Sequence, residues 1–262
     1  MKIPFCKLHG AKNDFLLTYV EDAPADHLAE TAVAICDRYT GVGADGWMLV
    51  DRTPGPGFDA SIRLFNSDGS EPELSGNGTR CAAALLARER AGVEFRIRTG
   101  AGIKHLRLLA QSGQHYEFEM NMGEAHVTEL HATVQGRDAV ILDVGNPQCV
   151  MPVADFDFDW HAVGAATERD PRFPGRTNVS FVRSTGQHAI DVRFWERGAG
   201  VTNSSGTGST GAVAAFLARG LVLEPVAVHT PAGILGVRSE NKLLYLTGPA
   251  EMTAEGIYLS NQ

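Results

Sequence analysis

The stretch ELSGNGTRCAAALLA at residues 73–87 has a near-copy, SSGTGSTGAVAAFLA, at residues 204–218. In each stretch a serine, Ser75 or Ser205, precedes Gly-x-Gly and an alanine-rich run that predicts a helix. A serine at this place is a typical helix N-cap, and the glycines after it let a ligand approach the backbone closely. The two serines lie 130 positions apart. The sequence therefore predicts two similar halves, each with its own helix entrance.

Composition restricts the class of protein. The chain has 262 residues, of which 44% are hydrophobic and 21% charged, as in a globular protein with a substantial core. The net charge of −8 argues against non-specific nucleic-acid binding. The chain has no apolar run of the ~20 residues that a membrane span needs. Its first residues lack a long apolar core and a cleavage site, so we expect no secretory signal. Its four scattered cysteines have no metal-binding spacing and favour reduced thiols, so we expect a cytoplasmic protein.

Strand-like alternation dominates both halves and determines the expected fold class. Helical spacing is confined to the two serine-led runs and to residues 25–41 and 161–170, the first of which should end at Gly41. Two separate strands, at 243–249 and 256–261, should finish the chain. The expected class is α+β, with two pseudo-symmetric domains, each a mostly antiparallel sheet wrapped around a central helix.

The predicted domains are residues 1–120 and 121–251, with a boundary near 118–128. Whether the last strand, about 252–262, returns to the first domain stays open at this point. A helix N-terminus carries about half a positive charge and several unpaired N–H donors, so it binds anions. Two such termini, one from each domain, should converge on one carboxylate or one developing oxyanion in a cleft between the domains.

Seven blocks along the chain resemble the diaminopimelate epimerase family, in the order and spacing of that family. They are HGAKNDF (9–15), GVGADG (41–46), FNSDGSEPELSGNGTRC (65–81), VGNPQCV (144–150), RTNVSF (176–181), ERGAGVTNSSGTGS (196–209) and LYLTGPAE (244–251). The resemblance implies two pseudo-symmetric domains with the active site between them, a small amino-acid substrate, and no metal or pyridoxal cofactor. It leaves a homodimer open.

The resemblance also assigns substrate-binding residues. Those that would hold the distal amino-carboxylate end of the substrate are Asn13, Asn66, Asn146, Asn178 and Arg197. Those that would cradle the reacting α-carboxylate are Gly76, Asn77, Gly206 and Thr207. An arginine suits the first role because its planar fork binds a carboxylate bidentately. A single asparagine is more often a turn or cap residue, but five residues at the family's positions favour binding.

Three departures from the family fall on its catalytic residues. In the family two cysteines face the α-carbon from opposite sides, one removing a proton while the other donates one. Their positions hold Ser75 and Ser205 in this chain, and Gln148 stands where the family's GNPH motif has a histidine beside the first base. Glu196, which by resemblance is a substrate-binding residue and the partner of the second base, is retained. A serine hydroxyl is a weak base unless a neighbour activates it.

Three functions remain open from the sequence. The first is an isomerase that interconverts LL- and meso-diaminopimelate, or a close relative, by α-proton transfer in lysine and peptidoglycan-precursor biosynthesis. The second is a related isomerase or dehydratase with a single base, which would be Glu196, Glu71 or Glu73. The third is an amino-acid-binding protein without catalysis.

Overall fold

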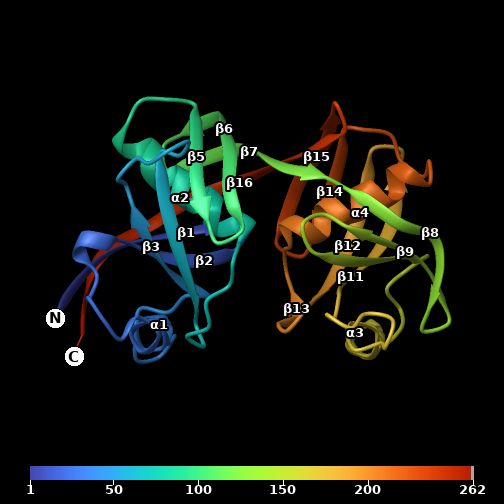
Figure 1. The fold of residues 1–262 in the computed structure, drawn as a ribbon, viewed down its shortest axis with the longest axis horizontal. Coiled ribbons are helices and arrows are strands. Elements are labelled where there is room, and N and C mark those ends of the chain that lie inside the picture. The colour runs from blue at the N-terminus through green and yellow to red at the C-terminus, as the bar shows by residue number, and fades with distance from the viewer. Residues whose placement is uncertain (261–262) are drawn as a thin grey trace. The chain divides into compact units, whose positions relative to one another are not determined.

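The computed structural model describes residues 1–260, so residues 261 and 262, where the predicted final strand ends, lie outside it. The chain divides into two compact units, unit 1 (Met1–Met120 and Gly248–Gln262) and unit 2 (Asn121–Thr247). Each unit is a curved, mostly antiparallel sheet around one long helix, with a shorter helix on the outside (Figure 1). The predicted α+β class with two similar halves is confirmed.

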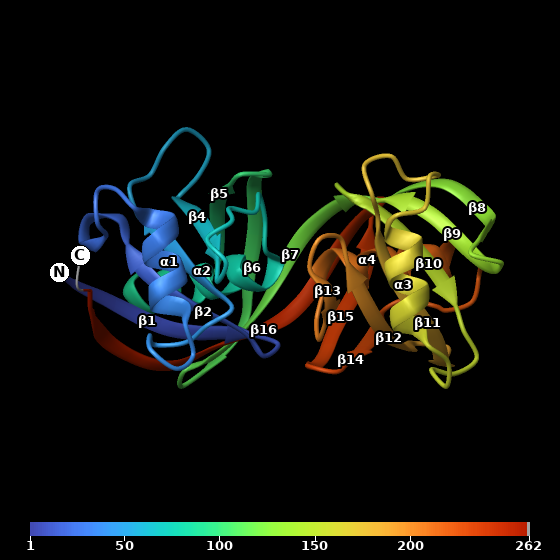
Figure 2. The same cartoon turned by 90° about the horizontal axis from the view of Figure 1, so that it is seen from below.

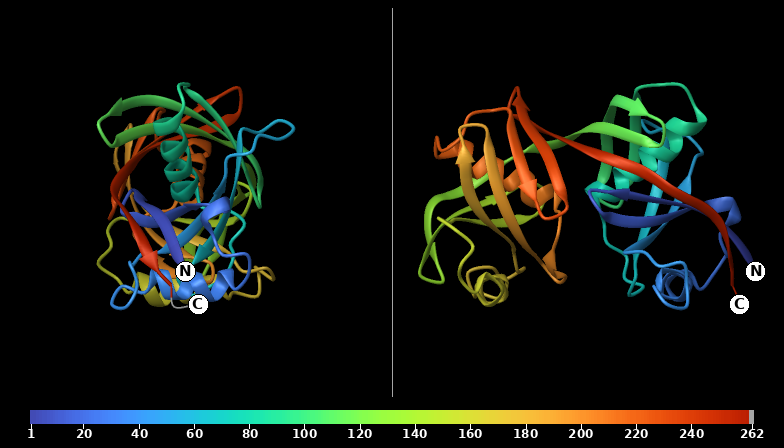
Figure 3. Two further views of the ribbon diagram at one scale, coloured as in Figure 1. Left: turned by 90° about the vertical axis from the view of Figure 1, so that its left-hand side faces the viewer. Right: turned by 180° about the vertical axis from the view of Figure 1, so that it is seen from behind.

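Unit 1 is a closed sheet around a buried helix. Its strands are β1 (Lys2–Gly10), β2 (Asn13–Tyr19), β3 (Gly46–Asp51), β4 (Ala60–Asn66), β5 (Glu94–Thr99), β6 (Gly102–Ser112), β7 (His115–Glu124) and the second part of β16 (Leu243–Leu259). They follow one another in that order, and β16 pairs back to β1. Helix α2 (Gly76–Glu89) lies inside, with residues 77–86 buried (Figure 3, left). Between β2 and the outer helix α1 (Leu28–Cys36) lies the short 3-10 helix η1 (Val20–Asp22).

Unit 2 repeats this plan. Its strands are β8 (His126–Val134), β9 (Arg137–Asp143), β10 (Pro147–Pro152), β11 (Asn178–Gly186), β12 (Ala189–Glu196), β13 (Gly200–Thr202), β14 (Val226–Thr230), β15 (Gly233–Glu240) and the first part of β16. Helix α4 (Gly206–Ala218) is the buried one. The shorter α3 (Trp160–Glu168) packs on β11 and β12 from outside, as Figure 2 shows.

The parallel strand pairs explain where the helices lie. In unit 1, β2 is parallel to β3 and β4 is parallel to β5, and the connections contain α1 and α2. In unit 2, β10 is parallel to β11 and β12 to β14, and the connections contain α3 and α4. Parallel neighbours need a long crossover, which is usually a helix. The two serine-led helices therefore occupy equivalent places in the two units. No helix within residues 1–260 is long and apolar enough to cross a membrane.

The helix expected over residues 25–41 is shorter than its periodicity suggests. Helix α1 ends at Cys36, and the next residue, Asp37, has an extended backbone. The Asp37 carboxylate accepts hydrogen bonds from the backbone N–H groups of Tyr39 (2.9 Å) and Thr40 (2.6 Å). These local bonds compete with another helical turn and end the helix before Gly41.

The two strands expected at 243–249 and 256–261 form one strand, β16. Pairing with β15 ends at Thr247, and pairing with β1 begins at Glu251. Pro249 lies between the stretches that pair with β15 and with β1, and the strand runs through it from Leu243 to Leu259. The first part of β16 therefore belongs to the sheet of unit 2 and the second part to that of unit 1.

Trp47 provides a test of the core of unit 1. Its side chain is fully buried, and its indole Nε1 donates a 2.9 Å hydrogen bond to Thr18 Oγ1. Trp47→Ala should lower the free energy of unfolding by about 3–5 kcal/mol because it leaves a cavity. Tyr39→Ala, at a ring that is 98% exposed, should change it by less than about 0.5 kcal/mol. Urea unfolding followed by circular dichroism compares the two variants, and similar losses would contradict this assignment of the core.

Candidate functional site

The two predicted helix entrances are confirmed. Ser75 precedes α2 in an extended conformation, and its Oγ accepts a 3.1 Å hydrogen bond from the N–H of Gly78. Ser205 precedes α4 in the same way, and its Oγ accepts a 3.0 Å hydrogen bond from the N–H of Gly208. The other N–H groups of each first turn have no partner within the helix. Each entrance therefore offers backbone donors to an anion.

The second glycine of each S-G-x-G motif has a packing role. A Cβ atom on Gly78 would lie 2.7 Å from Cε of Met48, and one on Gly208 would lie 2.8 Å from the Phe194 ring. Real Cβ atoms do not approach neighbours so closely. At Gly208 the neighbour is a buried ring, so a larger residue would push α4 off its sheet, whereas at Gly78 the flexible end of Met48 could move aside. Part of the sequence repeat is thus explained by packing rather than by ligand binding.

In unit 1 the structure brings Asn13 and Asn77 together beside the entrance of α2. Asn77 Nδ2 donates a 3.3 Å hydrogen bond to Asn13 Oδ1, and Asn13 Nδ2 donates one of 2.7 Å to Asp45 Oδ2. Asn66, at the end of β4, donates instead to Ser70 Oγ at 2.9 Å. Of the residues predicted in this unit, Asn13 and Asn77 are joined by a hydrogen bond, Gly76 precedes Asn77 in the first turn of α2, and Asn66 belongs to a neighbouring turn.

In unit 2 the predicted residues Gln148, Asn146 and Thr207 form a chain of hydrogen bonds. Gln148 Nε2 donates to Asn146 Oδ1 at 2.7 Å, and Asn146 Nδ2 donates to Thr207 Oγ1 at 3.3 Å. Gln148 is fully buried, and its Cγ would lie 3.1 Å from a Cβ atom on Gly211 of α4. A neutral amide cannot act as a base. The contacts instead give Gln148 the role of orienting Asn146 toward the entrance of α4, next to Gly206.

Asn178 connects β10 to the segment that carries Arg197. Its Nδ2 donates a 3.0 Å hydrogen bond to the Pro147 carbonyl, and its Oδ1 accepts one of 3.0 Å from the Arg197 backbone N–H. The guanidinium of Arg197 is exposed and donates to the Gly175 carbonyl at 3.2 Å. A carboxylate could therefore reach this guanidinium from solvent.

Of the three candidate bases, Glu196 lies beside one of the two cap serines, Ser205. Burial raises the pKa of the Glu196 carboxyl above its ordinary value, while the hydroxyls of Ser205 and Thr202 act against this rise. Ser205 is itself buried, whereas Ser75 is half-buried. A carboxylate with a raised pKa next to a hydroxyl has the arrangement of a general base and its proton donor.

The alternative bases Glu71 and Glu73 lie on the surface of unit 1. Both carboxylates are exposed, and Glu71 accepts hydrogen bonds of 2.8 Å from Nε and Nη2 of Arg63. These bonds hold the pKa of Glu71 below its ordinary value. A carboxylate stabilised in its ionised form is a weaker base, so the geometry favours Glu196 over Glu71.

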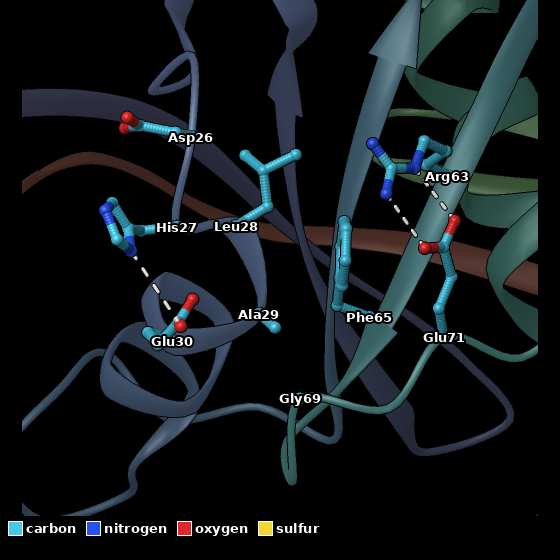
Figure 4. A pocket seen from close by; sticks show the side chains of 9 residues that line it. All are labelled: Asp26, His27, Leu28, Ala29, Glu30, Arg63, Phe65, Gly69 and Glu71. Atoms are coloured by element: carbon cyan, nitrogen blue, oxygen red, sulfur yellow. Dashed lines mark hydrogen bonds and ion pairs between the residues drawn. The ribbon is translucent and has the colours of Figure 1, made fainter.

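Two hollows of unit 1 share the Arg63–Glu71 pair as a wall. One, of about 330 Å³, reaches Ser75 and Thr99. The other, of about 410 Å³, lies between the start of α1 and the Phe65 ring, as Figure 4 shows. Of the two, the first adjoins the entrance of α2 and is the one that a ligand of this entrance could extend into.

The four cysteines do not supply the thiols that the family has at positions 75 and 205. All are unpaired, and burial raises the pKa of Cys36, Cys81 and Cys149 to about 12 and that of Cys6 to a smaller extent. Such thiols stay protonated at neutral pH. Among the residues that the structure describes, no group of three or more His, Cys, Asp or Glu side chains is placed to hold a metal ion.

Glu168, at the end of α3, is a supporting residue that the sequence did not reveal. Its Oε2 accepts a 2.8 Å hydrogen bond from Trp195 Nε1, and its Oε1 accepts bonds from the Gly198 N–H at 2.9 Å and from Arg176 Nη1 at 3.4 Å. Burial alone would raise the pKa of Glu168, but these donors hold it below its ordinary value. Because the contacts lie on both sides of residues 196–197, Glu168 fixes the segment that carries the predicted base and arginine.

Comparison with known proteins gives one consistent result. The chain matches the family described as diaminopimelate epimerase over residues 5–128 and 140–253. It is 39% identical to the diaminopimelate epimerase of Microcystis aeruginosa, over 98% of this chain and 99% of that protein. It is 37% identical to that of Pelotomaculum thermopropionicum, over 97% and 98%. A crystal structure of a phenazine biosynthesis protein from Bacillus anthracis has the same fold, with a TM-score of 0.74 at 14% identity over 99% of this chain and all of that one.

The anchoring role of Glu168 can be measured as stability against pH. Glu168→Gln should lower the free energy of unfolding by about 1–3 kcal/mol at pH 7, because an amide cannot accept from both Trp195 and Gly198. The carboxylate's contribution is complete above its unfolded pKa of about 4.3 and is lost as pH falls through the lower folded value, so the two proteins should converge in acid. Urea unfolding from pH 7 to pH 3 measures this.

The matched control is Glu129→Gln, at a carboxylate that pairs with Arg172 at the surface. It should change the free energy of unfolding by no more than about 0.5 kcal/mol. A difference between Glu168→Gln and the parent that stays constant over the whole pH range would contradict the anchoring role.

Proposed function

The chain belongs to the diaminopimelate epimerase family, and from this premise we propose that it interconverts LL- and meso-diaminopimelate, or a close relative, by moving the α-proton. It is an isomerase, and its reaction serves lysine and peptidoglycan-precursor biosynthesis. The observation that carries the proposal is the repeated helix entrance. Both units cap an equivalent buried helix with a serine. Asn13 is hydrogen-bonded to Asn77 of the first turn of α2, and Asn146 to Thr207 of the first turn of α4.

In the proposed reaction the helix entrances bind the reacting carboxylate. The first N–H groups of α2 and α4, at Gly76, Asn77, Gly206 and Thr207, stabilise the negative charge that develops on this carboxylate as the α-proton leaves. Such charge stabilisation requires no metal and no pyridoxal phosphate. The proposal requires Ser75 and Ser205 to reach opposite faces of one α-carbon.

The two serines have different partners, so the two directions of the reaction differ. When Ser205 Oγ takes the α-proton, its own hydroxyl proton passes to Glu196, and the Ser75 hydroxyl donates a proton to the other face of the carbanion. The proton on Glu196 then returns to Ser75 through solvent. In the reverse direction Ser75 must take the proton, and the residue that resemblance assigns as its partner, Gln148, is a neutral amide.

The distal end of the substrate is assigned to the side chains that the family uses for it. In this proposal the exposed guanidinium of Arg197 binds the second carboxylate bidentately. The hydrogen bond from its backbone to Asn178 fixes its position. The asparagines that complete this assignment are Asn13, Asn66 and Asn146.

The proposed setting of the reaction is the cytoplasm. All four cysteines are unpaired, as is usual in a reducing compartment. The residues assigned to the chemistry come from one chain, and a homodimer is compatible with this assignment.

Proton exchange in heavy water tests the proposal. Proton NMR of the stereoisomers of diaminopimelate with the wild-type chain should show loss of the α-proton signal, fastest for the isomer that presents this proton to Ser205. The rate should rise with pH through the raised pKa of Glu196, because the base must be ionised. Glu196→Gln should lower the rate by about 10²-fold or more. The control Glu240→Gln, at an exposed carboxylate paired with Arg238, should leave it unchanged.

Two results would replace this function by another. Binding of diaminopimelate by calorimetry, without exchange of any α-proton, would identify an amino-acid-binding protein. A product with a new double bond would identify a dehydratase that uses Glu196 as its single base.

Thiols at the two caps should increase epimerisation. The combination Ser75→Cys with Ser205→Cys should turn over diaminopimelate faster than the wild type, because a thiolate is accessible at neutral pH and an alkoxide is not. Adding Gln148→His should increase the rate again, because it restores the imidazole that resemblance assigns to the first thiol. Ser112→Cys, at an exposed residue of β6, is the control for adding a thiol elsewhere. A wild type that already turns over well and gains nothing from the thiols would show that the hydroxyls suffice.

A further inference from the structure

Arg80 is a buried cation just after the entrance of α2. Its side chain has 0% exposure, and its Nε donates a 3.1 Å hydrogen bond to the Pro249 carbonyl. Its Nη2 donates to Asn77 Oδ1 at 2.5 Å. Within residues 1–260 its Nη1 has no hydrogen-bond partner, and no carboxylate neutralises the guanidinium. Burial lowers the pKa of Arg80 to about 10, so the group is still charged at neutral pH.

Arg219 shows that this chain also contains a buried arginine with the usual structural contacts. It follows α4, and its guanidinium donates to the carbonyls of Leu130 and Ala139 and pairs with the carboxylate of Asp138. A buried charge costs folding free energy unless it is paired, and Arg219 is paired. The charge of Arg80 is not offset in this way and is free to act on an anion bound from outside.

The repeat provides an internal comparison for Arg80. Five residues after Ser75 stands Arg80, and five residues after Ser205 stands Thr210. The Thr210 hydroxyl donates a 2.8 Å hydrogen bond to the Gly206 carbonyl within its own helix. The entrance of α4 is therefore formed without a buried cation at this position. The cap and the helix do not require Arg80, so its presence needs another explanation.

Arg80 also ends a chain of hydrogen bonds that orients the amides at the entrance. Arg38 binds Asp45, Asp45 accepts from Asn13, Asn13 accepts from Asn77, and Asn77 accepts from Arg80. Along this series of hydrogen bonds, the side-chain oxygens of Asn13 and Asn77 each accept from a donor of the protein. The remaining amide hydrogens are donors, as are the N–H groups of the first helical turn. A carboxylate fits these donors.

We propose that Arg80 is a positioning residue that makes the entrance of α2 specific for a carboxylate. It turns Asn77, and through it Asn13, so that their N–H groups are available to the ligand, and it adds an unneutralised positive charge beneath the helix end. This inference deepens the proposed function and depends on it for the identity of the carboxylate. The field of Arg80 at Ser75 is a property of unit 1 and can be measured without a substrate.

A thiol at the cap reports this field. In the Ser75→Cys variant, the rate of alkylation by iodoacetamide against pH gives the midpoint at which the new thiol ionises, after subtraction of the rate of the chain that keeps Ser75. The native thiols interfere little, since burial raises the pKa of Cys36, Cys81 and Cys149 to about 12. The midpoint should lie below the value of about 8.5 for an ordinary thiol.

Neutral replacements of Arg80 should raise this midpoint by about one pH unit. Arg80→Gln keeps hydrogen-bond donors, Arg80→Met keeps the length of the side chain, and Arg80→Lys keeps the charge. The midpoint should rise with Gln and with Met and stay within about 0.3 units with Lys. The matched control Arg219→Gln removes a buried arginine of unit 2, and it should lower the melting temperature without moving the midpoint.

The inference is overturned if the midpoint of the parent Ser75→Cys variant is about 8.5 or higher. It is also overturned if a folded Arg80→Gln or Arg80→Met variant keeps the parent's midpoint. If neither neutral variant folds, the midpoint of the Ser75→Cys variant is measured in 1 M salt. A buried charge is screened far less than a surface charge, so a shift caused by Arg80 should persist. A midpoint that returns to the ordinary value in high salt would then refute Arg80 as its cause. Absence of epimerase activity affects none of these outcomes, so failure of the proposed function is distinguishable.

Discussion

The crossover between parallel strands is the constraint on which the structure depends. Strands β4 and β5, like β12 and β14, lie side by side and run in the same direction, so the chain must return along its length before it can pair. In both units the return segment is a helix enclosed by its own sheet. The helix must therefore be apolar around nearly its whole circumference, which is why alanine, small residues and close-packing glycines fill it.

The same constraint determines where polar groups can lie. Only the end of an enclosed helix reaches a ligand, so the polar residues gather at the caps and on the strand ends beside them. The two caps then differ in their surroundings. The cap of α2 has a buried cation behind it, whereas the cap of α4 has a carboxyl with a raised pKa beside it. One geometry, repeated, thus gives two chemically different ends.

Local chemistry determined how much could be predicted from the sequence. The caps and their helices were predictable because a serine, two glycines and an alanine-rich run act within a few residues. The end of α1 was missed because the Asp37 carboxylate binds the next turn more effectively than helical periodicity suggests. Glu168 was missed because its partners Trp195 and Gly198 lie 27 and 30 positions away. Arg80 was missed because a sequence does not show that a buried guanidinium lacks a carboxylate partner. The family resemblance named the candidate site residues, but not the hydrogen bonds that Gln148 and Asn178 make.

The pairing of β1 with the end of β16 has a consequence for synthesis on the ribosome. Lys2 pairs with Leu259, so β1 cannot complete its pairing until the end of β16 has also been made. Until then the nascent unit 1 has open edges at β1 and β7, which could pair with a strand of another chain. Unit 2, by contrast, is contiguous from Asn121 to Thr247 and can complete its sheet earlier. The order of completion is therefore the reverse of the order of translation, and the N-terminal unit has the longer period of exposure to chaperones and to misassembly.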